Sequence, residues 1–478
     1  MKNIFKDKKI TMLGLGVLGR GVNVAKFLAK KGAILIITDK KTAEQLAPAI
    51  KQLKAFKNIK YVFGEHNLSD FQNADMVIKA ASVPLDSLYI AEARKNNIPV
   101  EMDASLFVKL NLATIIGITG TRGKSTVTQL IYEIIQNYLV AKPPSKKKKV
   151  FLGGNVKGLA TLPLLNKVKS GDIVVMELDS WQLQGFGDSK ISPHISVFTN
   201  LMCDHQNYYK NSMKQYFEDK TNIFKYQKNG DILVIGKRFL PDLKKFGLSE
   251  IFADLKKNTE SKIITAKTDK KIKTKLLGSH NKENIALAVK ACQQLGINEK
   301  IIKKTVADFR GIPGRLEFIG EKKGIKYYND TTATTPDGVI AALKALQNHL
   351  AIRRPGESQE NKIILIGGGT DKELDYTEYV KLVLKYIKTL ILFKGTASEK
   401  IKKVLSNQSA IISTRKKEKQ KINIISNITS MKDAVAEAQK FTKKGDIVLL
   451  SPGAASFGVF KNEFDRGEQF NKIVKKLR

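Results

Sequence analysis

Short apolar runs alternate with helical patterns along this chain, and this alternation constrains its fold more than any other feature. Parallel strands are joined by crossovers that are usually helical, so the alternation is typical of layered α/β architecture. It predicts an α/β chain built on mostly parallel sheets. The apolar runs are at 10–13, 34–37, 76–78, 115–118, 173–176, 195–198, 232–235, 363–366, 390–393 and 447–450.

A glycine turn follows the first apolar run. Gly14-Leu15-Gly16-Val17-Leu18-Gly19 matches G-x-G-x-x-G, and the next run ends at Thr38-Asp39. In a βαβ unit such glycines let a phosphate approach the helix N-terminus, and the acid can take ribose hydroxyls. The motif indicates a nucleotide or nucleotide-diphosphate site; the alternative is a glycine turn kept for strand–helix packing.

A second glycine-rich segment lies between an apolar run and a helical pattern. Its core is Gly120-Thr121-Arg122-Gly123-Lys124-Ser125-Thr126, although the strict phosphate-loop spacing would place glycine where Ile118 stands. Consecutive backbone N–H groups in such a loop form an anion nest. Lys124 can reach the β and γ phosphates, and the Ser125 hydroxyl can bind Mg²⁺. The segment predicts ATP or GTP binding.

Several polar side chains follow other predicted strands. Glu177 is placed where ligands bind at the carboxyl ends of parallel strands, and a carboxylate there suits Mg²⁺. For Asp179 we expect a helix cap instead. The residues alone leave His205 undecided between a structural and a functional role. Cys203 beside it has too few partners for a zinc site.

Composition excludes several classes of protein. Hydrophobic residues make up 42% and charged residues 27% of the chain, a soluble globular balance. Two cysteines exclude a disulfide framework. No apolar run approaches the ~20 residues that cross a bilayer, and the basic start does not read as a signal peptide, so we expect a cytoplasmic protein without a membrane partner.

The net charge is high. Lys and Arg number 83 against 45 Asp and Glu, which gives +38. Such a field attracts polyanions, but no aromatic-interleaved basic stripe or groove-reading motif is visible, so we do not expect a nucleic-acid partner. The basic stretches at 142–149, 353–361 and 415–421 are interpreted as solvated surface loops.

The motifs occur in the order found in the Mur ligases, and the chain resembles that family over nearly its whole length. The segments that carry the resemblance are the phosphate loop at 117–126, Gly153-Gly154-Asn155-Val156, Glu177-Leu178-Asp179-Ser180-Trp181-Gln182-Leu183, Asn200 with Asp204-His205, Tyr216 to Phe224 with Lys220, Gly278-Ser279-His280-Asn281 with Asn284, Gly311 to Glu317, Asn329 to Thr334, Gly367 to Lys372, and Leu450 to Phe457. Within the family the chain is most similar to the members that add D-glutamate. Three features carry this similarity: the dinucleotide-type first domain, the G-G-G-x-D-K segment and the ending Phe460-Lys461-Asn462…Arg466-Gly467.

The resemblance implies an architecture of three domains. At about 150 residues per domain, 478 residues suggest the same number. We expect a Rossmann-like UDP-substrate domain at 1–112, a central P-loop ATPase-like domain at 113–311 and a Rossmann-like amino-acid domain at 312–478. A monomer is expected.

The resemblance also implies an activity. It is the ATP-dependent, ADP-forming addition of D-glutamate to UDP-N-acetylmuramoyl-L-alanine through an acyl phosphate, in peptidoglycan precursor synthesis. Two Mg²⁺ ions are implied as cofactors beside ATP, and Lys220 is implied to be carbamylated.

Roles for individual residues follow from the same resemblance. The implied catalytic residues are Lys124, Glu177, His205 and Lys220, and the implied metal ligands are Ser125, Glu177, His205 and Lys220. The implied ATP-binding residues are Gly120, Thr121, Arg122, Gly123, Lys124, Ser125, Thr126, Asn281, Asn284, Arg315 and Asp330. The implied UDP-substrate residues are Gly14, Leu15, Gly16, Val17, Leu18, Thr38, Asp39 and Asn155. The implied glutamate residues are Thr334, Lys372, Ser456 and Phe464.

The sequence departs from the family at positions that bear on the amino acid. Thr332 stands where many members have Lys, and Gly314 stands where His is common. Glu463 precedes Phe464, which leaves the alignment of the aromatic open by one position. These departures keep open another Mur-type ligase with a different amino acid or L-glutamate. A folylpolyglutamate-type synthetase is disfavoured because it has no domain equivalent to the first one here. A nicotinamide oxidoreductase is disfavoured because it would have no use for the phosphate loop at 120–125. The net charge leaves a polyanion-binding P-loop protein as a further alternative.

Overall fold

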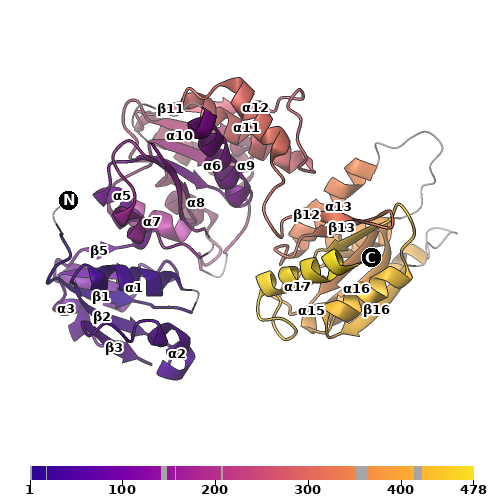
Figure 1. Cartoon of the computed structure of the whole chain (residues 1–478), viewed down its shortest axis with the longest axis horizontal. Coiled ribbons are helices and arrows are strands. Elements are labelled where there is room, and N and C mark those ends of the chain that lie inside the picture. Colours follow the sequence, from indigo (N-terminus) through magenta and orange to yellow (C-terminus); the bar gives the residue numbers. More distant parts are fainter. Residues whose placement is uncertain are drawn as a thin grey trace. The chain divides into compact units, whose positions relative to one another are not determined.

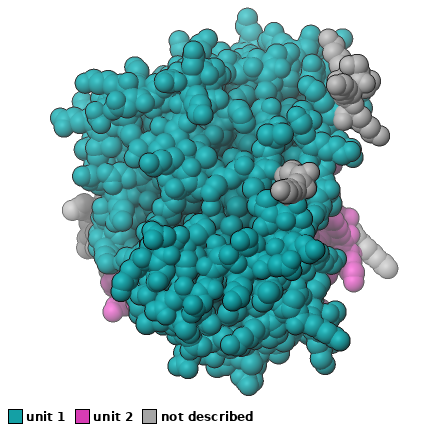
Figure 2. Space-filling view, turned by 90° about the vertical axis from the view of Figure 1, so that its left-hand side faces the viewer, with its two compact units in different colours: residues 1–273, 283–306 teal, residues 274–282, 307–478 magenta. Residues whose placement is uncertain are grey.

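The computed structural model of the chain forms three sheets (Figure 1). It describes residues 3–17, 19–141, 148–156, 158–205, 208–350, 363–413 and 422–477. The chain divides into two compact units (Figure 2): Met1–Lys273 with Glu283–Val306, and Thr274–Lys282 with Ala307–Arg478. The first unit holds the first two sheets and the second holds the third.

The first sheet has the strand order β3-β2-β1-β4-β5, and all its pairings are parallel. The order reverses direction between β1 and β4, which is where doubly wound sheets open a ligand crevice at their carboxyl edge. Its strands are β1 (Lys9–Leu13), β2 (Ile34–Asp39), β3 (Ile59–Phe63), β4 (Met76–Lys79) and β5 (Val100–Glu101). Its helices are α1 (Arg20–Lys30), α2 (Ala43–Lys51), α3 (Ser69–Gln72), α4 (Leu88–Lys95) and α5 (Asp103–Leu110).

The second sheet is also parallel, with the order β11-β10-β9-β6-β8-β7. Its central strand β6 therefore has β8 and β9 as neighbours. The strands are β6 (Thr114–Thr119), β7 (Val150–Gly154), β8 (Ile173–Glu177), β9 (Ile195–Phe198), β10 (Ile232–Gly236) and β11 (Lys262–Ala266). The helices are α6 (Lys124–Ala141), the 3₁₀ helix η1 (Leu162–Asn166), α7 (Ser180–Asp188), α8 (Met213–Thr221), α9 (Phe239–Lys245), α10 (Ser249–Lys257), α11 (Ser279–Gln294) and α12 (Glu299–Asp308).

The third sheet is mixed, with the order β12-β13-β17-β14-β15-β16, because β12 runs antiparallel to β13. Its strands are β12 (Glu317–Lys322), β13 (Ile325–Asn329), β14 (Ile363–Gly368), β15 (Ile387–Phe393), β16 (Asn423–Ile428) and β17 (Ile447–Leu450). Its helices are α13 (Pro336–Leu350), α14 (Thr377–Tyr386), α15 (Thr396–Ser413), α16 (Met431–Lys440) and α17 (Glu463–Lys476).

The α/β prediction is confirmed, and each predicted apolar run lies in a strand. Strands buried on both faces, such as β14 and β17, appear in the sequence as unbroken apolar runs. Among the described helices, none is long and apolar enough to cross a membrane. The predicted boundaries at 112/113 and 311/312 stay predictions. The basic stretches lie almost entirely outside the described residues.

Candidate active site

The phosphate-loop segment forms the turn between β6 and α6. Gly120 and Gly123 have positive φ angles of 131° and 85°. A Cβ on Gly120 would stand 1.9 Å from Thr199 Oγ1, and one on Gly123 would stand 2.3 Å from Asn284 Oδ1. Glycine is therefore required at both positions by backbone conformation and by close neighbours.

Residues that follow β9 hold the loop in shape. The Asn200 carbonyl accepts a bond from Thr121 N at 2.9 Å, and its side-chain oxygen accepts one from Arg122 N at 2.9 Å. Thr199 Oγ1 donates to the Arg122 carbonyl at 2.6 Å. These contacts fix the loop from the neighbouring strand. Asn200 is part of the segment with Asp204-His205 that carries the resemblance, but the sequence analysis gave no role to it.

Two lysines converge on the loop. Lys124 Nζ donates to the carbonyls of Gly120 and Thr121, each at 3.0 Å, and Lys220 Nζ donates to the Gly120 carbonyl at 3.1 Å. Lys220 is 1% exposed, and its ammonium lies 4.6 Å from the Tyr216 ring centroid. Burial, followed by the charge of Lys124, holds the Lys220 pKa well below its usual range.

The strands on the other side of β6 bring in an acid and an amide. Glu177, the last residue of β8, is 7% exposed, and its carbonyl accepts a bond from Asn155 N at 2.6 Å. A Cβ on Gly154 would stand 2.1 Å from that carbonyl. Glycine is therefore required at position 154, where the Gly-Gly-Asn segment runs beside the backbone of Glu177. Asp179 caps α7 by accepting from Gln182 N at 2.7 Å, which confirms its expected role.

His205 lies in the loop after β9 with a positive φ of 53°. Its ring centroid is 4.7 Å from that of Trp181, and its Nε2 is 3.9 Å from Asp204 Oδ2. Burial is the largest influence on its pKa and lowers it, against the Asp204 charge, which raises it. A lowered pKa favours the neutral imidazole that can bind a metal. Within the described ranges, no group of three His, Cys, Asp or Glu side chains is arranged to hold a metal ion.

Two asparagines of α11 have different surroundings. Asn284 is 6% exposed and reaches the phosphate loop at Gly123. Asn281 Nδ2 donates to the Leu277 carbonyl at 2.8 Å, within the segment 274–282 that belongs to the second unit. Asn284 therefore lies at the predicted ATP-binding loop, and Asn281 stays a predicted ATP-binding residue.

In the first sheet, Asp39 lies at the glycine turn. Its Oδ2 accepts from Leu15 N at 2.9 Å and Gly16 N at 3.0 Å, while Oδ1 accepts from Lys41 N at 3.0 Å. Burial works to raise the Asp39 pKa, but these bonds together lower it. The carboxylate thus organises the turn that we expected to bind a diphosphate.

Two more of the predicted UDP-substrate residues lie in this region. Thr38 is fully buried, with its hydroxyl 2.6 Å from His66 Nδ1. Val17 is 59% exposed at the turn. The predicted residue Leu18 lies outside the described residues.

Arg20, which the sequence analysis did not single out, links the glycine turn to the second sheet. Its guanidinium donates to the carbonyls of Gly154 and Leu159, each at 3.2 Å, and to Asn155 Oδ1 at 3.1 Å. The structure therefore places Asn155 beside the start of α1. The two regions predicted to hold the UDP substrate, the glycine turn and the segment at Asn155, thus lie next to each other. The available signal was a cation directly after Gly19.

In the second unit, Asp330 follows β13 and is 8% exposed. Its carboxylate accepts from Leu316 N at 3.0 Å and Ser451 Oγ at 2.7 Å. Burial raises the Asp330 pKa to about 7, while these bonds and the charge of Arg315 work to lower it. Asp330 and Arg315 thus belong to one local cluster, as their predicted shared role requires.

Three of the four predicted glutamate residues, Thr334, Lys372 and Ser456, lie on the loops after β13, β14 and β17. Lys372 Nζ donates to Thr334 Oγ1 at 3.2 Å. The loops of β14 and β17 are joined by reciprocal backbone bonds between Thr370 and Ala455, each at 3.0 Å, and Ser456 in the second loop is 5% exposed. Phe464 is partly buried in the first turn of α17.

Arg466 of α17 belongs to the ending motif, but the sequence analysis gave no role to it. It is fully buried and donates to Thr331 Oγ1 at 3.1 Å, the Thr331 carbonyl at 2.9 Å and the Ala454 carbonyl at 3.4 Å. Burial lowers its pKa to about 10. Arg466 thereby ties the loop after β13, which carries Thr334, to the loop after β17, which carries Ser456.

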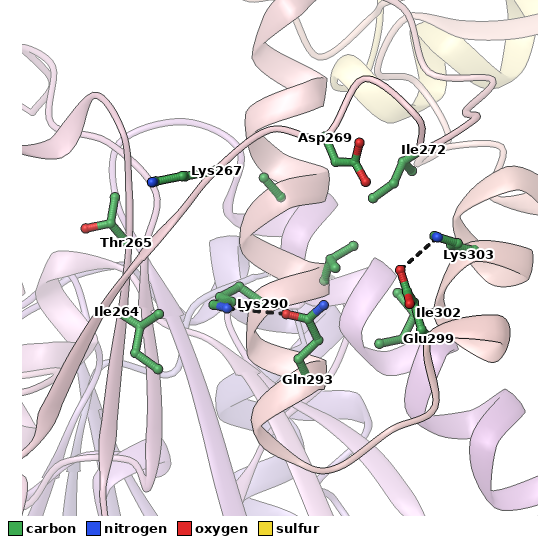
Figure 3. A pocket seen from close by; sticks show the side chains of 12 residues that line it. Ile264, Thr265, Lys267, Asp269, Ile272, Lys290, Gln293, Glu299, Ile302 and Lys303 are labelled. Carbon is green, nitrogen blue, oxygen red and sulfur yellow. Dashed lines mark hydrogen bonds and ion pairs between the residues drawn. The ribbon is translucent and has the colours of Figure 1, made fainter.

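A separate pocket of about 380 Å³ opens between β11, α11 and α12 (Figure 3). Its floor is apolar, and two of its lysines have partners, since Lys303 pairs with Glu299 at 2.7 Å and Lys290 donates to Gln293 at 3.5 Å. None of the residues predicted to bind a substrate or cofactor lines it.

Known families match all three parts of the chain. The Mur ligase MurD-like N-terminal domain matches residues 8–101, the Mur ligase middle domain residues 118–292, and the Mur ligase glutamate ligase domain residues 314–453. The UDP-N-acetylmuramoylalanine–D-glutamate ligase of Borreliella burgdorferi is 34% identical over 99% of this chain and 98% of its own length. Those of Clostridium kluyveri and Roseiflexus are 32% and 30% identical, over 99% and 98% of this chain and 98% of each relative.

The chain belongs to the Mur ligase family. This membership confirms the predicted enzyme class, an ATP-dependent, ADP-forming amide-bond ligase, and excludes the oxidoreductase and the polyanion-binding alternatives as its primary activity. It also confirms ATP as the nucleotide.

Solved structures of the family share the fold. The UDP-N-acetylmuramate-alanine ligase MurC of Thermotoga maritima superposes with a TM-score of 0.57 at 18% identity, covering 98% of this chain and 100% of MurC. MurF of the same organism, in complex with ADP, gives a TM-score of 0.57 at 18% identity and covers 100% of both chains. At this identity the likeness shows the fold, and it confirms the predicted three-part architecture.

Proposed function

We propose that this ligase adds D-glutamate to UDP-N-acetylmuramoyl-L-alanine in peptidoglycan precursor synthesis. The observation that carries the proposal is identity of 34% along the whole chain to a relative named for that reaction. The three α/β parts of the chain also offer one region for each of three anionic ligands. Since those ligands include ATP and a UDP-linked precursor, we place the enzyme in the cytoplasm, as a monomer.

ATP would lie on the loop between β6 and α6. The backbone N–H groups of the loop and Lys124 suit a polyphosphate, and Asn284 is already against Gly123. Arg315 and Asp330 are also proposed as ATP-binding residues. The proposed domain limits are 1–112 for the UDP substrate, 113–311 for ATP and 312–478 for the amino acid.

The donor set near the loop fits Mg²⁺. Mg²⁺ usually takes few protein ligands and fills its shell with phosphate oxygens and water, so a site without three converging protein ligands is compatible with it. Ser125, Glu177, His205 and Lys220 are the proposed ligands of two ions, which would offset charge on the transferred phosphoryl group.

Lys220 is proposed to act after carbamylation. The reaction needs a neutral amine to attack CO₂, and the buried Lys220 has a lowered pKa. The product is an anionic carbamate, which would also remove the repulsion between two ammonium groups that now share the Gly120 carbonyl.

The chemistry proceeds in two steps. The alanine carboxylate of the acceptor attacks the γ-phosphorus of ATP, ADP leaves, and an acyl phosphate forms. The amine of D-glutamate then attacks the acyl carbon and phosphate leaves. Lys124 stabilises charge on the transferred group, while Thr334, Lys372, Ser456 and Phe464 are proposed to hold glutamate, with the Lys372 ammonium opposite a carboxylate.

The test is ATP-dependent phosphate release by the purified chain with Mg²⁺, bicarbonate and UDP-N-acetylmuramoyl-L-alanine. Parallel reactions contain D-glutamate, L-glutamate, other amino acids or none. Release only with D-glutamate, together with the mass of the UDP-linked dipeptide, is the expected result. No release in any combination, beside an active control enzyme, would overturn the proposal.

The second candidate function is the addition of a different amino acid by the same ligase mechanism. One observation favours testing other amino acids in the phosphate-release assay. Thr332 stands where many relatives carry lysine, and its hydroxyl donates to the Gly314 carbonyl at 3.0 Å instead of offering a cation. Release with another amino acid would keep the ligase mechanism and assign the change to this part of the pocket.

A further inference from the structure

His66 follows β3 in the first sheet, and neither the sequence motifs nor the proposed mechanism gives it a role. Its Nδ1 lies 2.6 Å from the Thr38 hydroxyl oxygen. Its ring packs edge to face on Tyr89 of α4 and on Phe71 of α3, with centroid distances of 4.8 and 6.5 Å. The imidazole is therefore held by two helices while one of its nitrogens contacts the end of β2.

The second contact of the Thr38 hydroxyl determines which ring nitrogen carries the hydrogen. The hydroxyl lies 3.3 Å from the Glu65 carbonyl, to which it can only donate. Since a hydroxyl has one hydrogen, both contacts are hydrogen bonds at once only when His66 Nδ1 donates to Thr38 Oγ1. Thr38 is fully buried, so these two bonds satisfy a hydroxyl that water does not reach.

The glycine turn of the proposed UDP site rests on the end of β2. Three consecutive amide groups of the turn donate to Thr38 and Asp39 there. Gly14 N donates to the Thr38 carbonyl at 2.8 Å, and Leu15 N and Gly16 N donate to Asp39 Oδ2 at 2.9 and 3.0 Å. A shift of this strand end would therefore move the turn with it.

The loop that carries His66 has its own attachment to the end of β2. Gly64 N donates to the Asp39 carbonyl at 3.0 Å and to the Lys41 carbonyl at 3.2 Å. These backbone bonds do not involve the imidazole. Replacing the His66 side chain should therefore remove its contact with Thr38 without releasing the loop.

We propose that His66 is a positioning residue for the UDP-linked acceptor: by donating to the Thr38 hydroxyl, it fixes the strand end on which the glycine turn rests. The inference rests on the proposed function, since that function assigns the glycine turn to the UDP substrate. His66 acts on acceptor affinity and not on phosphoryl transfer, because its contacts lie within the first sheet and the helices of that sheet.

Two amide variants separate the two ring nitrogens. His66→Asn places an amide near the position of Nδ1 and can still donate to Thr38, whereas His66→Gln places the amide nearer the position of Nε2. His66→Leu removes both nitrogens, and Glu65→Leu, at an exposed side chain of the same loop, is the matched control. The measurements are the calorimetric Kd for UDP-N-acetylmuramoyl-L-alanine, the KM for the same acceptor, kcat, and the Kd for ADP.

We expect His66→Leu to raise the Kd and the KM for the acceptor about fivefold or more above the control, because a buried hydroxyl loses a partner. The kcat and the Kd for ADP should stay close to those of the control, which also shows that the variant is folded. His66→Asn should recover most of the acceptor affinity, and His66→Gln should not. Recovery by Gln and not by Asn would assign the effect to Nε2 and overturn the positioning role.

A double-mutant cycle with Thr38→Val tests the contact itself. If His66 acts through the Thr38 hydroxyl, His66→Leu adds no further rise in the acceptor Kd once Thr38 is Val. Multiplying effects, or a His66→Leu chain that binds the acceptor as tightly as the Glu65→Leu control, would overturn the inference. The Kd needs no turnover, so a chain that binds the acceptor but shows no D-glutamate-dependent phosphate release would overturn the proposed function, while the Kd series still decides the role of His66.

Discussion

At the scale of single residues, three cations of the predicted binding regions donate to neutral groups. Lys124 and Lys220 both donate to the Gly120 carbonyl, and Arg466 donates to a hydroxyl and two carbonyls. Each of these hydrogen bonds ends on a neutral oxygen. Because such cations favour incoming anions, the arrangement suits a ligase whose three substrates are all anionic.

Asp330 gives a prediction about stability and pH. Its folded pKa of about 7 lies above the ordinary value of 3.8, so the folded chain binds more protons than the unfolded chain between these limits. The unfolding free energy should therefore fall as pH rises from about 4 to about 7. Asp330→Asn should flatten this dependence, measured by denaturant unfolding across that range.

The control for this prediction is Asp337→Asn, at an exposed acid in the first turn of α13. It should leave the pH dependence as it is in the unaltered chain. An Asp330→Asn chain whose stability falls with pH as steeply as that of the control would contradict the raised pKa.

At the scale of elements, the strand–glycine turn–helix unit sets the geometry of the predicted ATP site. Gly123→Ala would bring a Cβ to 2.3 Å from Asn284 Oδ1 at a φ of 85°. We expect loss of ADP binding, measured by calorimetry, because the loop and α11 cannot both keep their positions. Gly230→Ala is a matched control, since its φ is 93° and no atom lies within 4 Å of the added Cβ.

The control should cost about 1–2 kcal/mol of stability through backbone strain alone and keep ADP binding. If Gly123→Ala binds ADP as tightly as Gly230→Ala, the close approach of Asn284 to the loop is not needed for nucleotide binding.

Much of the fold was predictable at this scale, and the reason is local. Central strands such as β6, β14 and β17 are buried on both faces and are therefore continuous apolar runs. The edge strands β3 and β16 contain exposed positions, such as Lys60 in β3, and gave no comparable run. The loops that carry Lys124 and Asp39 were found because glycine motifs identify them.

The rest of the site was not predictable because it depends on contacts between distant segments. Arg20, Asn200 and Arg466 donate to or accept from groups that are 12 to 139 residues away. One lysine or arginine among 83 has no local signal that separates it from the others. Lys220 likewise was identified through the family resemblance, whereas its burial is visible only in the folded chain.

At the scale of the whole molecule, the proposed UDP substrate would bind where the first two layers of the first unit meet. Arg20 is the side chain that spans this junction, from α1 to the Gly154–Leu159 segment. Asp103 adds a second link, since its carboxylate accepts from Thr161 N at 2.9 Å and Leu162 N at 2.6 Å. These contacts join the layer predicted to bind UDP to the layer predicted to bind ATP.

Arg20→Met should therefore raise the KM for the UDP acceptor more than it lowers kcat. Loss of hydrogen bonds from a charged donor costs about 1.5–3 kcal/mol, which corresponds to a rise of roughly 10- to 150-fold. The KM for ATP should change little, because Arg20 donates to Gly154, Asn155 and Leu159 and not to the residues of the phosphate loop. Arg20→Lys should be intermediate, since an ammonium cannot reproduce the planar fork of a guanidinium.

Lys30→Met, at the exposed end of α1, is the control for this prediction. A fall in kcat with both KM values unchanged would show that Arg20 serves the chemical step and not the binding of the acceptor.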